Sequence, residues 1–241
     1  MLDRVREASQ EAAVCFSPEG DLVAGVVVLG IGLDAVLHTR HQPAAIATSA
    51  IPVLLGLHQI DEAFVWWGLQ GHVPAAVGRV AMWIYLYIAL VVLPATVPAL
   101  LLWIEPARVR RWLIAPFVLL GLVTAAVILE TMLTGHPRVR LADLHLAYSI
   151  GLGHGVTVIG CYIVATCGPL FLSSFRWFRW FGAANLVAVV TLAILVADGF
   201  TSLWCLYAAL VSAAVAWHLR SRSSHLANPE TFGTDTVVAT R

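Results

Sequence analysis

The sequence contains no lysine, and all fourteen of its basic residues are arginine. Without a lysine amine no Schiff base can form, which excludes retinal proteins and Schiff-base enzymes. Charged residues of either sign are scarce, at 12% of the chain, and the fourteen acidic residues leave no net charge. A chain without a basic field has little to attract a polyanion, so we expect no nucleic-acid partner.

The four cysteines form no C-x-x-C pair and have no paired spacing. Most lie in apolar runs, where a buried thiol behaves as a small hydrophobic side chain, so they say nothing about redox compartment. Apolar residues, in contrast, are abundant: 60% of the chain is hydrophobic and its mean hydropathy is +0.85. These values lie far from those of a soluble domain and predict an integral membrane protein, with the lipid bilayer as its partner.

Apolar runs close to the ~20 residues that cross a bilayer as a helix recur along the chain. We expect seven spans, at 18–37, 44–69, 76–104, 112–132, 145–172, 181–197 and 200–219. The predicted fold is therefore all-α, a seven-transmembrane-helix bundle over residues 18–219. A polar tail over 1–17, without a signal-peptide core, precedes the bundle, and a polar tail over 220–241, which we expect to be disordered, follows it.

The arginines of the loops predict the orientation of the bundle, because cytoplasmic loops carry an excess of basic residues. With the N-terminus outside, the inner set holds eight arginines and the outer set five: Arg40, Arg108, Arg110, Arg111, Arg176, Arg179, Arg220 and Arg222 against Arg4, Arg6, Arg79, Arg138 and Arg140. The distant Arg241 would make the inner set nine. This asymmetry favours an N-out, C-in topology.

Span 44–69 carries His58, Asp61 and Glu62 near and beyond its middle. Ionisable side chains at that depth are expensive and usually face a bundle interior or a wet cavity. The three share one helical face, and Glu62 is the better functional candidate because adjacent residues lie about 100° apart, so only one carboxylate can point fully inward. We expect the inward face of this span to carry Leu55, His58, Asp61, Glu62 and Val65. The opposite face, nearer lipid, is expected to carry Gly56, Ile60, Ala63 and Trp67.

Polar residues on other spans are predicted to reach the same depth. In the N-out topology the outer half of the bundle contains, at one depth, Glu62, Tyr148, His154, Trp204 and Cys205. We expect His58, Glu62 and His154 to converge around one polar cavity there, with Asp61, Tyr148 and Trp204 contacting a ligand. Two imidazoles and a carboxylate suffice for zinc with an open fourth position, so His58, Glu62 and His154 form a candidate metal site. The structural alternative is a core histidine bonded to a neighbouring helix, with the carboxylates paired to Arg79 or a tyrosine.

Two classes of function fit these residues. The first is a metal-dependent hydrolase or transferase acting on a lipid-like substrate, with Glu62 as ligand or catalytic base. The second is a carrier or sensor of a small molecule, not an enzyme, in which His58 and Glu62 exchange a proton within the membrane. A haem protein is a third option, because bis-histidine ligation needs only two inward histidines.

Four sequence blocks resemble those of a family of uncharacterised bacterial multi-pass membrane proteins. The blocks are Cys15-Phe16-Ser17-x-Glu19, His58-Gln59-x-x-Glu62-x-x-Val65-Trp66-Trp67, His145-x-Ala147-Tyr148-Ser149 and Asp198-Gly199-x-x-Ser202-Leu203-Trp204-Cys205. The resemblance covers roughly residues 14–220 and implies a multi-pass protein of the bacterial cytoplasmic membrane. That family has no established activity. The chain also resembles, more loosely, the seven-span alkaline ceramidases. It lacks their H-x-x-x-H pair on the last helix, where only His218 is present.

Overall fold

A computed structural model describes residues 17–39, 43–142 and 145–195 of the chain. Its helices are α2 (Pro18–Thr39), α3 (Pro43–Gln70), α4 (Ala75–Tyr87), α5 (Leu93–Ile104), α6 (Arg108–Thr134), α7 (Gly155–Leu172) and α8 (Arg176–Leu195). A π-helical turn, η2 (Ile88–Val92), joins α4 to α5, and two short strands, β1 (Arg138–Ala142) and β2 (His145–Ser149), lie between α6 and α7. The described part of the chain is thus mostly helical, as predicted.

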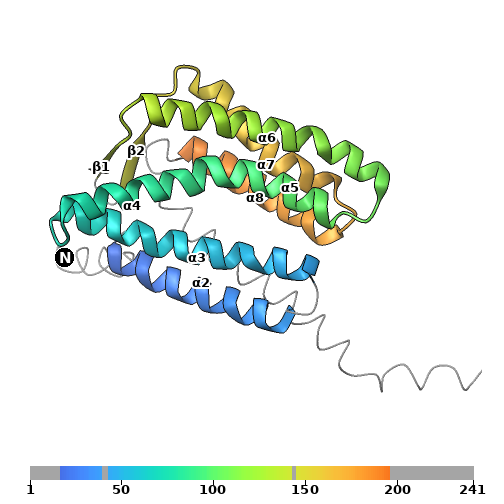
Figure 1. The fold of residues 1–241 in the computed structure, drawn as a ribbon, viewed down its shortest axis with the longest axis horizontal. Helices are drawn as coiled ribbons and strands as arrows, with labels where there is room; N and C mark the ends of the chain where they lie inside the picture. The colour runs from blue at the N-terminus through green and yellow to red at the C-terminus, as the bar shows by residue number, and fades with distance from the viewer. Residues whose placement is uncertain (1–16, 40–42, 143–144, 196–241) are drawn as a thin grey trace, which may run out of the picture.

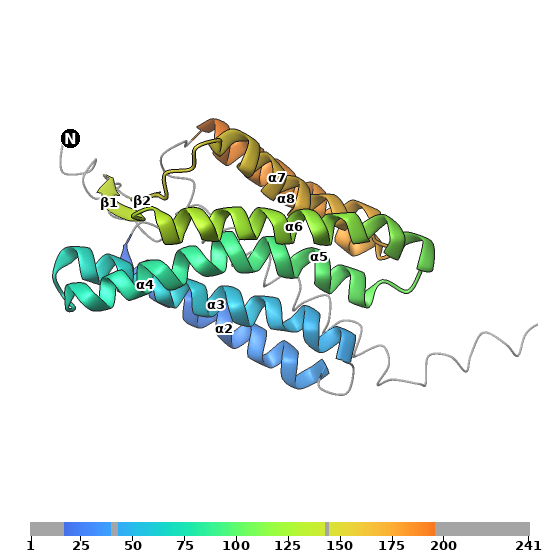
Figure 2. The same cartoon turned by 45° about the horizontal axis from the view of Figure 1, so that its top comes forward.

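The helices lie side by side along one long axis (Figures 1 and 2). α2 and α3 form an antiparallel pair along one side, and α4, η2 and α5 run as one long rod between that pair and α6. The helices α7 and α8 cover the other side of α5 and α6 (Figure 2). Large apolar side chains remain exposed on α2 and α6, including Val23, Leu119 and Leu122, as lipid contact requires.

Four of these helical stretches are long and apolar enough to cross a membrane: Pro18–Thr39, Ala75–Ile104, Arg108–Thr134 and Gly155–Leu172. Helices α3 and α8 match the predicted spans 44–69 and 181–197 in position but are not among the four. The seventh span predicted at 200–219, and both predicted tails apart from Ser17, lie outside the described residues.

The π-helical turn has a cause in the sequence. Pro94 has no backbone N–H, so the carbonyl one turn earlier loses its helical donor, and the helix widens before it into η2. One carbonyl of this turn finds a partner on another helix, because the Tyr162 hydroxyl of α7 donates to the Ala89 oxygen at 2.8 Å. The rod formed by α4 and α5 therefore contains a wide turn whose backbone is bonded to α7.

The prediction that a helix begins at His145 is wrong. Residues His145–Ser149 form β2, which pairs antiparallel with β1 so that Tyr148 lies opposite Val139. Residues 150–154 follow as an irregular connection in which Gly151 has a positive φ of 71°, a conformation that favours glycine. Helix α7 starts only at Gly155, ten residues after the predicted start of the span.

This hairpin contributes to the main apolar core. Leu146 of β2 is fully buried against side chains from α3, α4 and α6, among them Val65, Met82 and Met132. Tyr148, on the same face of β2, packs against the same cluster. The hairpin therefore closes one end of the bundle (Figure 1) beside the part of α3 that carries its polar residues.

Candidate functional site

Two adjacent turns of α3 bury polar side chains as completely as the apolar core. His58 is 1% exposed, Gln59 is not exposed, and Glu62 is 1% exposed. These three residues are called the α3 polar face below. The inward orientation predicted for His58 and Glu62 is confirmed, and Asp61 is only half buried. Polar groups without solvent are costly unless they are bonded, so their partners decide what the face does.

The imidazole of His58 is held by Tyr85 of α4 in two ways. Its Nε2 lies 3.2 Å from the Tyr85 carbonyl oxygen, and the two rings are stacked at 4.1 Å. A carbonyl only accepts, so Nε2 carries the proton and Nδ1 of the neutral ring is an acceptor. Nδ1 is buried and has no hydrogen-bond partner in the described part of the chain. His58 thus has one fixed nitrogen and one available nitrogen.

The ring stack continues into the hairpin. The rings of Tyr85 and Tyr148 are stacked, with their centroids 4.7 Å apart and an interplanar angle of 9°. Three stacked rings, from α3, α4 and β2, therefore follow one another. Offset-stacked pairs of this kind stabilise by about 0.5–1.5 kcal/mol beyond the area they bury. Tyr148 therefore reaches the α3 polar face through Tyr85, from a strand and not from the helix predicted for it.

Gln59 is the buried polar residue of α3 with the fewest hydrogen bonds to its side chain. Its side chain is fully buried, and neither its amide oxygen nor its amide nitrogen is hydrogen-bonded within the described residues. An unsatisfied buried polar group costs about 1–3 kcal/mol. Gln59 was not predicted as a site residue, although a glutamine between His58 and Glu62 in an apolar run was the available signal.

Asp21 of α2 is a second buried carboxylate that sequence reasoning missed; it is 2% exposed. Alanines in place of Gly25 and Gly32 would meet Ile60 and Val53 of α3. This antiparallel register places Asp21, one turn before Gly25, at the level of the last turns of α3, where Glu62 lies. The signal was a carboxylate in the first turn of an apolar span.

His154 does not join this cluster. It is exposed and precedes the first residue of α7, in the connection after β2. No group of three His, Cys, Asp or Glu side chains among the described residues is arranged to hold a metal ion. The described residues therefore do not gather His58, Glu62 and His154 into the predicted metal site, because His154 lies on the glycine-containing connection after β2 and not inside a helix.

The remaining predicted residues have separate outcomes. Asp61 is half buried with one buried oxygen, Oδ2, that has no partner within the described ranges. Arg79, considered as a partner for the carboxylates, is exposed on α4. Trp204, predicted to contact a ligand, lies outside the described residues, so its place relative to the α3 polar face stays a prediction.

Comparison with known proteins identifies the family. A family model described as a family of unknown function, DUF6629, matches residues 14–230. The chain belongs to this family. The match spans the whole described bundle, including the α3 polar face and the hairpin. No curated protein and no solved structure matches the chain, so these comparisons add no activity to the family assignment.

A second polar cluster in this family member lies at the other end of the bundle. Glu105, after α5, accepts hydrogen bonds from the backbone N–H groups of Ala107 (3.2 Å) and Ser174 (2.8 Å) and from the hydroxyls of Ser173 (3.2 Å) and Ser174. Arg110 of α6 donates through Nη1 to the carbonyls of Leu172 and Ser173, at 2.8 and 3.0 Å. These bonds, called the Glu105–Arg110 clamp below, tie the α5–α6 connection to the α7–α8 connection.

The clamp makes the stability of the protein depend on pH. Burial alone would raise the pKa of Glu105, but hydrogen bonds from Ser174, Ala107 and Ser173 outweigh it and hold the pKa below its ordinary value. A carboxyl with a depressed folded-state pKa stabilises the fold above its unfolded pKa, roughly 4.3, and loses that contribution as pH falls through the folded value. Glu105→Gln should therefore destabilise the protein at neutral pH and make little difference in acid.

Thermal unfolding of the wild type and of Glu105→Gln in the same lipid at pH 7 and at lower pH measures this dependence. We expect a loss of about 1.5–3 kcal/mol at pH 7, the contribution of a hydrogen bond to a charged group. Glu130→Gln, on an exposed face of α6, is the matched control and should change stability little. A difference between Glu105→Gln and the wild type that stays constant down to low pH would contradict the charged clamp.

Proposed function

We propose that this DUF6629 protein is a membrane-embedded carrier or sensor of a small polar molecule, in which the α3 polar face binds the ligand and a proton moves between Glu62 and His58. The observation that carries the proposal is the burial of Gln59, whose two amide atoms have no partner among the described residues, beside the available Nδ1 of His58. Buried polar groups with open bonding capacity mark a place for a ligand or ordered water.

The chemistry of these groups defines the ligand class. The Gln59 amide offers a donor and an acceptor, and His58 Nδ1 offers an acceptor beside them. A small neutral molecule with both an N–H or O–H donor and a carbonyl-type acceptor would satisfy all of these atoms. The face contains no cation, because Arg79 is exposed, so a bare anion would be poorly matched to the described site.

The proton step follows from the spacing of the ionisable groups. His58 and Glu62 are four residues apart and occupy one side of α3. A protonated Glu62 can release its proton, through a bound ligand or water, to the lone pair of Nδ1, giving a carboxylate and an imidazolium with Nε2–H still donated to Tyr85. Return of the proton regenerates the neutral pair, so no other reactant is consumed.

The metal-dependent hydrolase and the haem protein receive less support. The metal site of the hydrolase required His154 beside His58, and haem ligation required a second inward histidine. His154 is exposed on the connection before α7. The Nε2 of His58 is also engaged by the Tyr85 carbonyl and its ring is covered by the Tyr85 ring. A carrier or sensor needs no third ligand, so it fits the described residues better.

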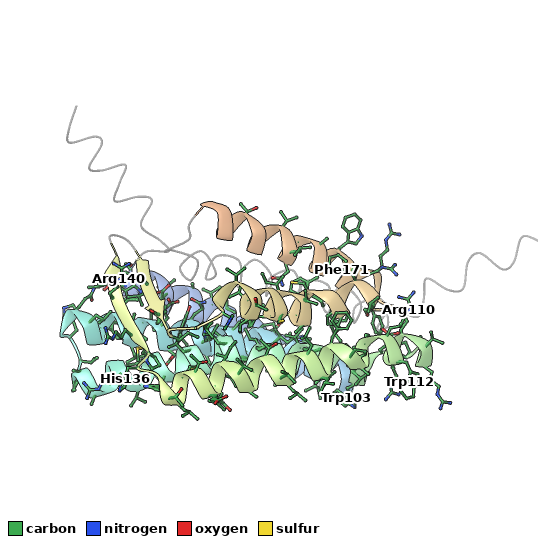
Figure 3. All side chains as sticks on the ribbon, turned by 90° about the horizontal axis from the view of Figure 1, so that it is seen from above. Trp103, Arg110, Trp112, His136, Arg140 and Phe171 are labelled. Atoms are coloured by element: carbon green, nitrogen blue, oxygen red, sulfur yellow. The ribbon has the colours of Figure 1, made fainter. Side chains whose placement is uncertain are left out.

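The proposed topology keeps the N-terminus outside and the C-terminus in the cytoplasm. Arg108, Arg110 and Arg111 lie in the first turn of α6, and Arg176 and Arg179 lie in the first turn of α8. The opposite end of the bundle carries Arg79 of α4 and Arg138 and Arg140 of β1, and Figure 3 shows Arg110 and Arg140 at opposite ends. The richer end is assigned to the cytoplasm. The α3 polar face then lies in the outer half of the membrane of a bacterial cell.

Infrared difference spectroscopy of the full-length protein in lipid bilayers tests the proton step. A protonated carboxylic acid has a C=O stretch that disappears on ionisation, so a pH titration follows each buried carboxyl directly. We expect one titrating band to be lost in Glu62→Gln and to be retained in Asp61→Asn, the matched control one residue away. His58→Gln should move the titration midpoint of the remaining band, because the two groups share a proton.

Two results would reject the proposal. A band unaffected by Glu62→Gln would show that another carboxyl titrates. A midpoint that is identical in the wild type and in His58→Gln would show that His58 and Glu62 are not coupled, leaving His58 as a core histidine bonded to Tyr85.

A further inference from the structure

The two connections joined by the Glu105–Arg110 clamp carry an unusual concentration of arginine. Residues 104–112 contain Arg108, Arg110 and Arg111, and residues 172–180 contain Arg176 and Arg179. Glu105 is the one carboxylate in these two segments. Its oxygens accept four hydrogen bonds, from Ala107, Ser173 and Ser174, and within the described residues none comes from an arginine. One carboxylate against five arginines leaves an excess of positive charge in these segments.

The clamp also fixes the two arginine groups beside one another. Arg110 spans from α6 to the carbonyls of Leu172 and Ser173, and Glu105 reaches the backbone of Ser174. Arg176 follows Ser174 by two residues, and Arg108 precedes Arg110 by two. Segments nearly seventy residues apart in the chain are therefore held beside each other.

Three of the arginines remain exposed after the clamp is formed. Arg108, Arg111 and Arg176 are exposed, and within the described residues none of them makes an ion pair. Each lies in the first turn of α6 or α8, neither of which has an acidic residue there. The positive end of a helix dipole is destabilised by a cation and stabilised by an anion. The arrangement is thus unfavourable until an anion joins it.

Exposed tryptophans surround these arginines and indicate where the anion comes from. Trp103, Trp112 and Trp180 are 58, 71 and 66% exposed. Figure 3 shows Trp103, Arg110 and Trp112 at one end of the bundle, with His136 and Arg140 at the opposite end. Tryptophan favours the headgroup level of a bilayer, and exposed apolar residues such as Leu113 continue from it along α6. The anion nearest to such a surface is a lipid headgroup.

We propose that Arg108, Arg111 and Arg176, with Trp103, Trp112 and Trp180, form a binding surface for the headgroup of an anionic phospholipid in the leaflet at this end of the bundle. The guanidinium fork matches phosphate oxygens in a bidentate manner, and the acyl chains of the lipid lie along the apolar surface of α6. The proposal depends on the membrane location of the chain and not on the proton step at His58 and Glu62.

Thermal unfolding in nanodiscs tests this surface. Full-length protein is placed in phosphatidylcholine discs with or without phosphatidylglycerol, and Tm is followed by tryptophan fluorescence. We expect phosphatidylglycerol to raise the Tm of the wild type, less so at high salt. The triple variant Arg108→Gln/Arg111→Gln/Arg176→Gln should lose most of that rise, because each arginine contributes roughly fivefold to the affinity for an anionic surface.

The control removes the same charge from the other end. Arg79→Gln/Arg138→Gln/Arg140→Gln should keep the wild-type rise in phosphatidylglycerol. An equal loss in both triple variants would overturn the proposal in favour of a general charge effect, and an equal rise caused by inorganic phosphate in phosphatidylcholine discs would overturn it in favour of free phosphate. Native mass spectrometry of the wild type, with preferential retention of phosphatidylglycerol over phosphatidylcholine expected, keeps the test independent of the folding of the variants. Equal retention of the two lipids would reject the surface.

Discussion

Replacing Gly56 by alanine is expected to cost the folded protein about 1–3 kcal/mol, the typical penalty for overpacking a well-filled interface. A Cβ at this position would lie 2.7 Å from the Leu29 Cα and 2.8 Å from its Cβ, and would also meet the Leu29 backbone nitrogen. Since backbone atoms cannot rotate away as a flexible side chain can, α2 must move from α3 to accommodate one methyl group. Unfolding of the purified protein in lipid–detergent mixtures measures the loss.

Gly30→Ala is the matched control for this substitution. Gly30 is exposed on α2, and an added Cβ there meets nothing within 4 Å. Alanine is favoured over glycine in a helix interior by roughly 0.5–1 kcal/mol, so this variant should be neutral or slightly more stable. If both variants had the same stability, the close approach of α2 to α3 would not exist and the placement of the α3 polar face against α2 would be wrong.

Gly56 also marks where helical periodicity was an insufficient guide. The pattern correctly predicted that Leu55, His58, Glu62 and Val65 point inward. It placed Gly56 and Ala63 nearer lipid, whereas both are buried, Ala63 completely. Small residues such as glycine and alanine contribute little to a hydropathy pattern. In membranes, however, they let helix backbones approach closely. α3 is therefore enclosed on two sides, by α2 and by the rest of the bundle.

Hydropathy identified the apolar helices α2, α4 to α5, α6 and α7 because length and composition alone decide that property. It failed at His145–Ser149, where Leu146 and Tyr148 of the core alternate with Ala147 and Ser149, which lie outside it. That two-residue period is the signature of a strand, but five residues are too few to stand out inside a run of apolar sequence. The predicted helix placed His154 inside a span, whereas the structure places it on the connection before α7. The metal site predicted from that helical position lost its basis.

The Glu105–Arg110 clamp could not be predicted for a different reason. Glu105 and Ser174 are far apart in the chain, and each resembles an ordinary loop residue. Only the packing of α6 against α7 brings their connections together. Charge counting captured the excess of arginine at this end but not the division between Arg110, which donates to backbone carbonyls, and the exposed arginines that remain free to meet an anion.

Replacing Gln59 by methionine separates a binding site from a structural one, because the two readings predict opposite signs. If the amide is reserved for a ligand, the ligand-free protein holds an unsatisfied polar group, and an apolar side chain of similar shape relieves a penalty of about 1–3 kcal/mol. Gln59→Met should then be more stable than the wild type. Such a gain accompanied by a loss of function is the usual sign of a functional site.

The same substitution at Gln70, exposed at the last residue of α3, is the control and should change stability by less than about 0.5 kcal/mol. Reversible unfolding in lipid–detergent mixtures gives both differences, and the infrared titration of Glu62 in the same samples reports the proton step. We expect Gln59→Met to be stabilised while the Glu62 band titrates at a changed midpoint, since the ligand or water beside it is displaced. A destabilised Gln59→Met would mean that the folded protein itself satisfies the amide, and Gln59 would then be part of the architecture of α3 and not of a binding site.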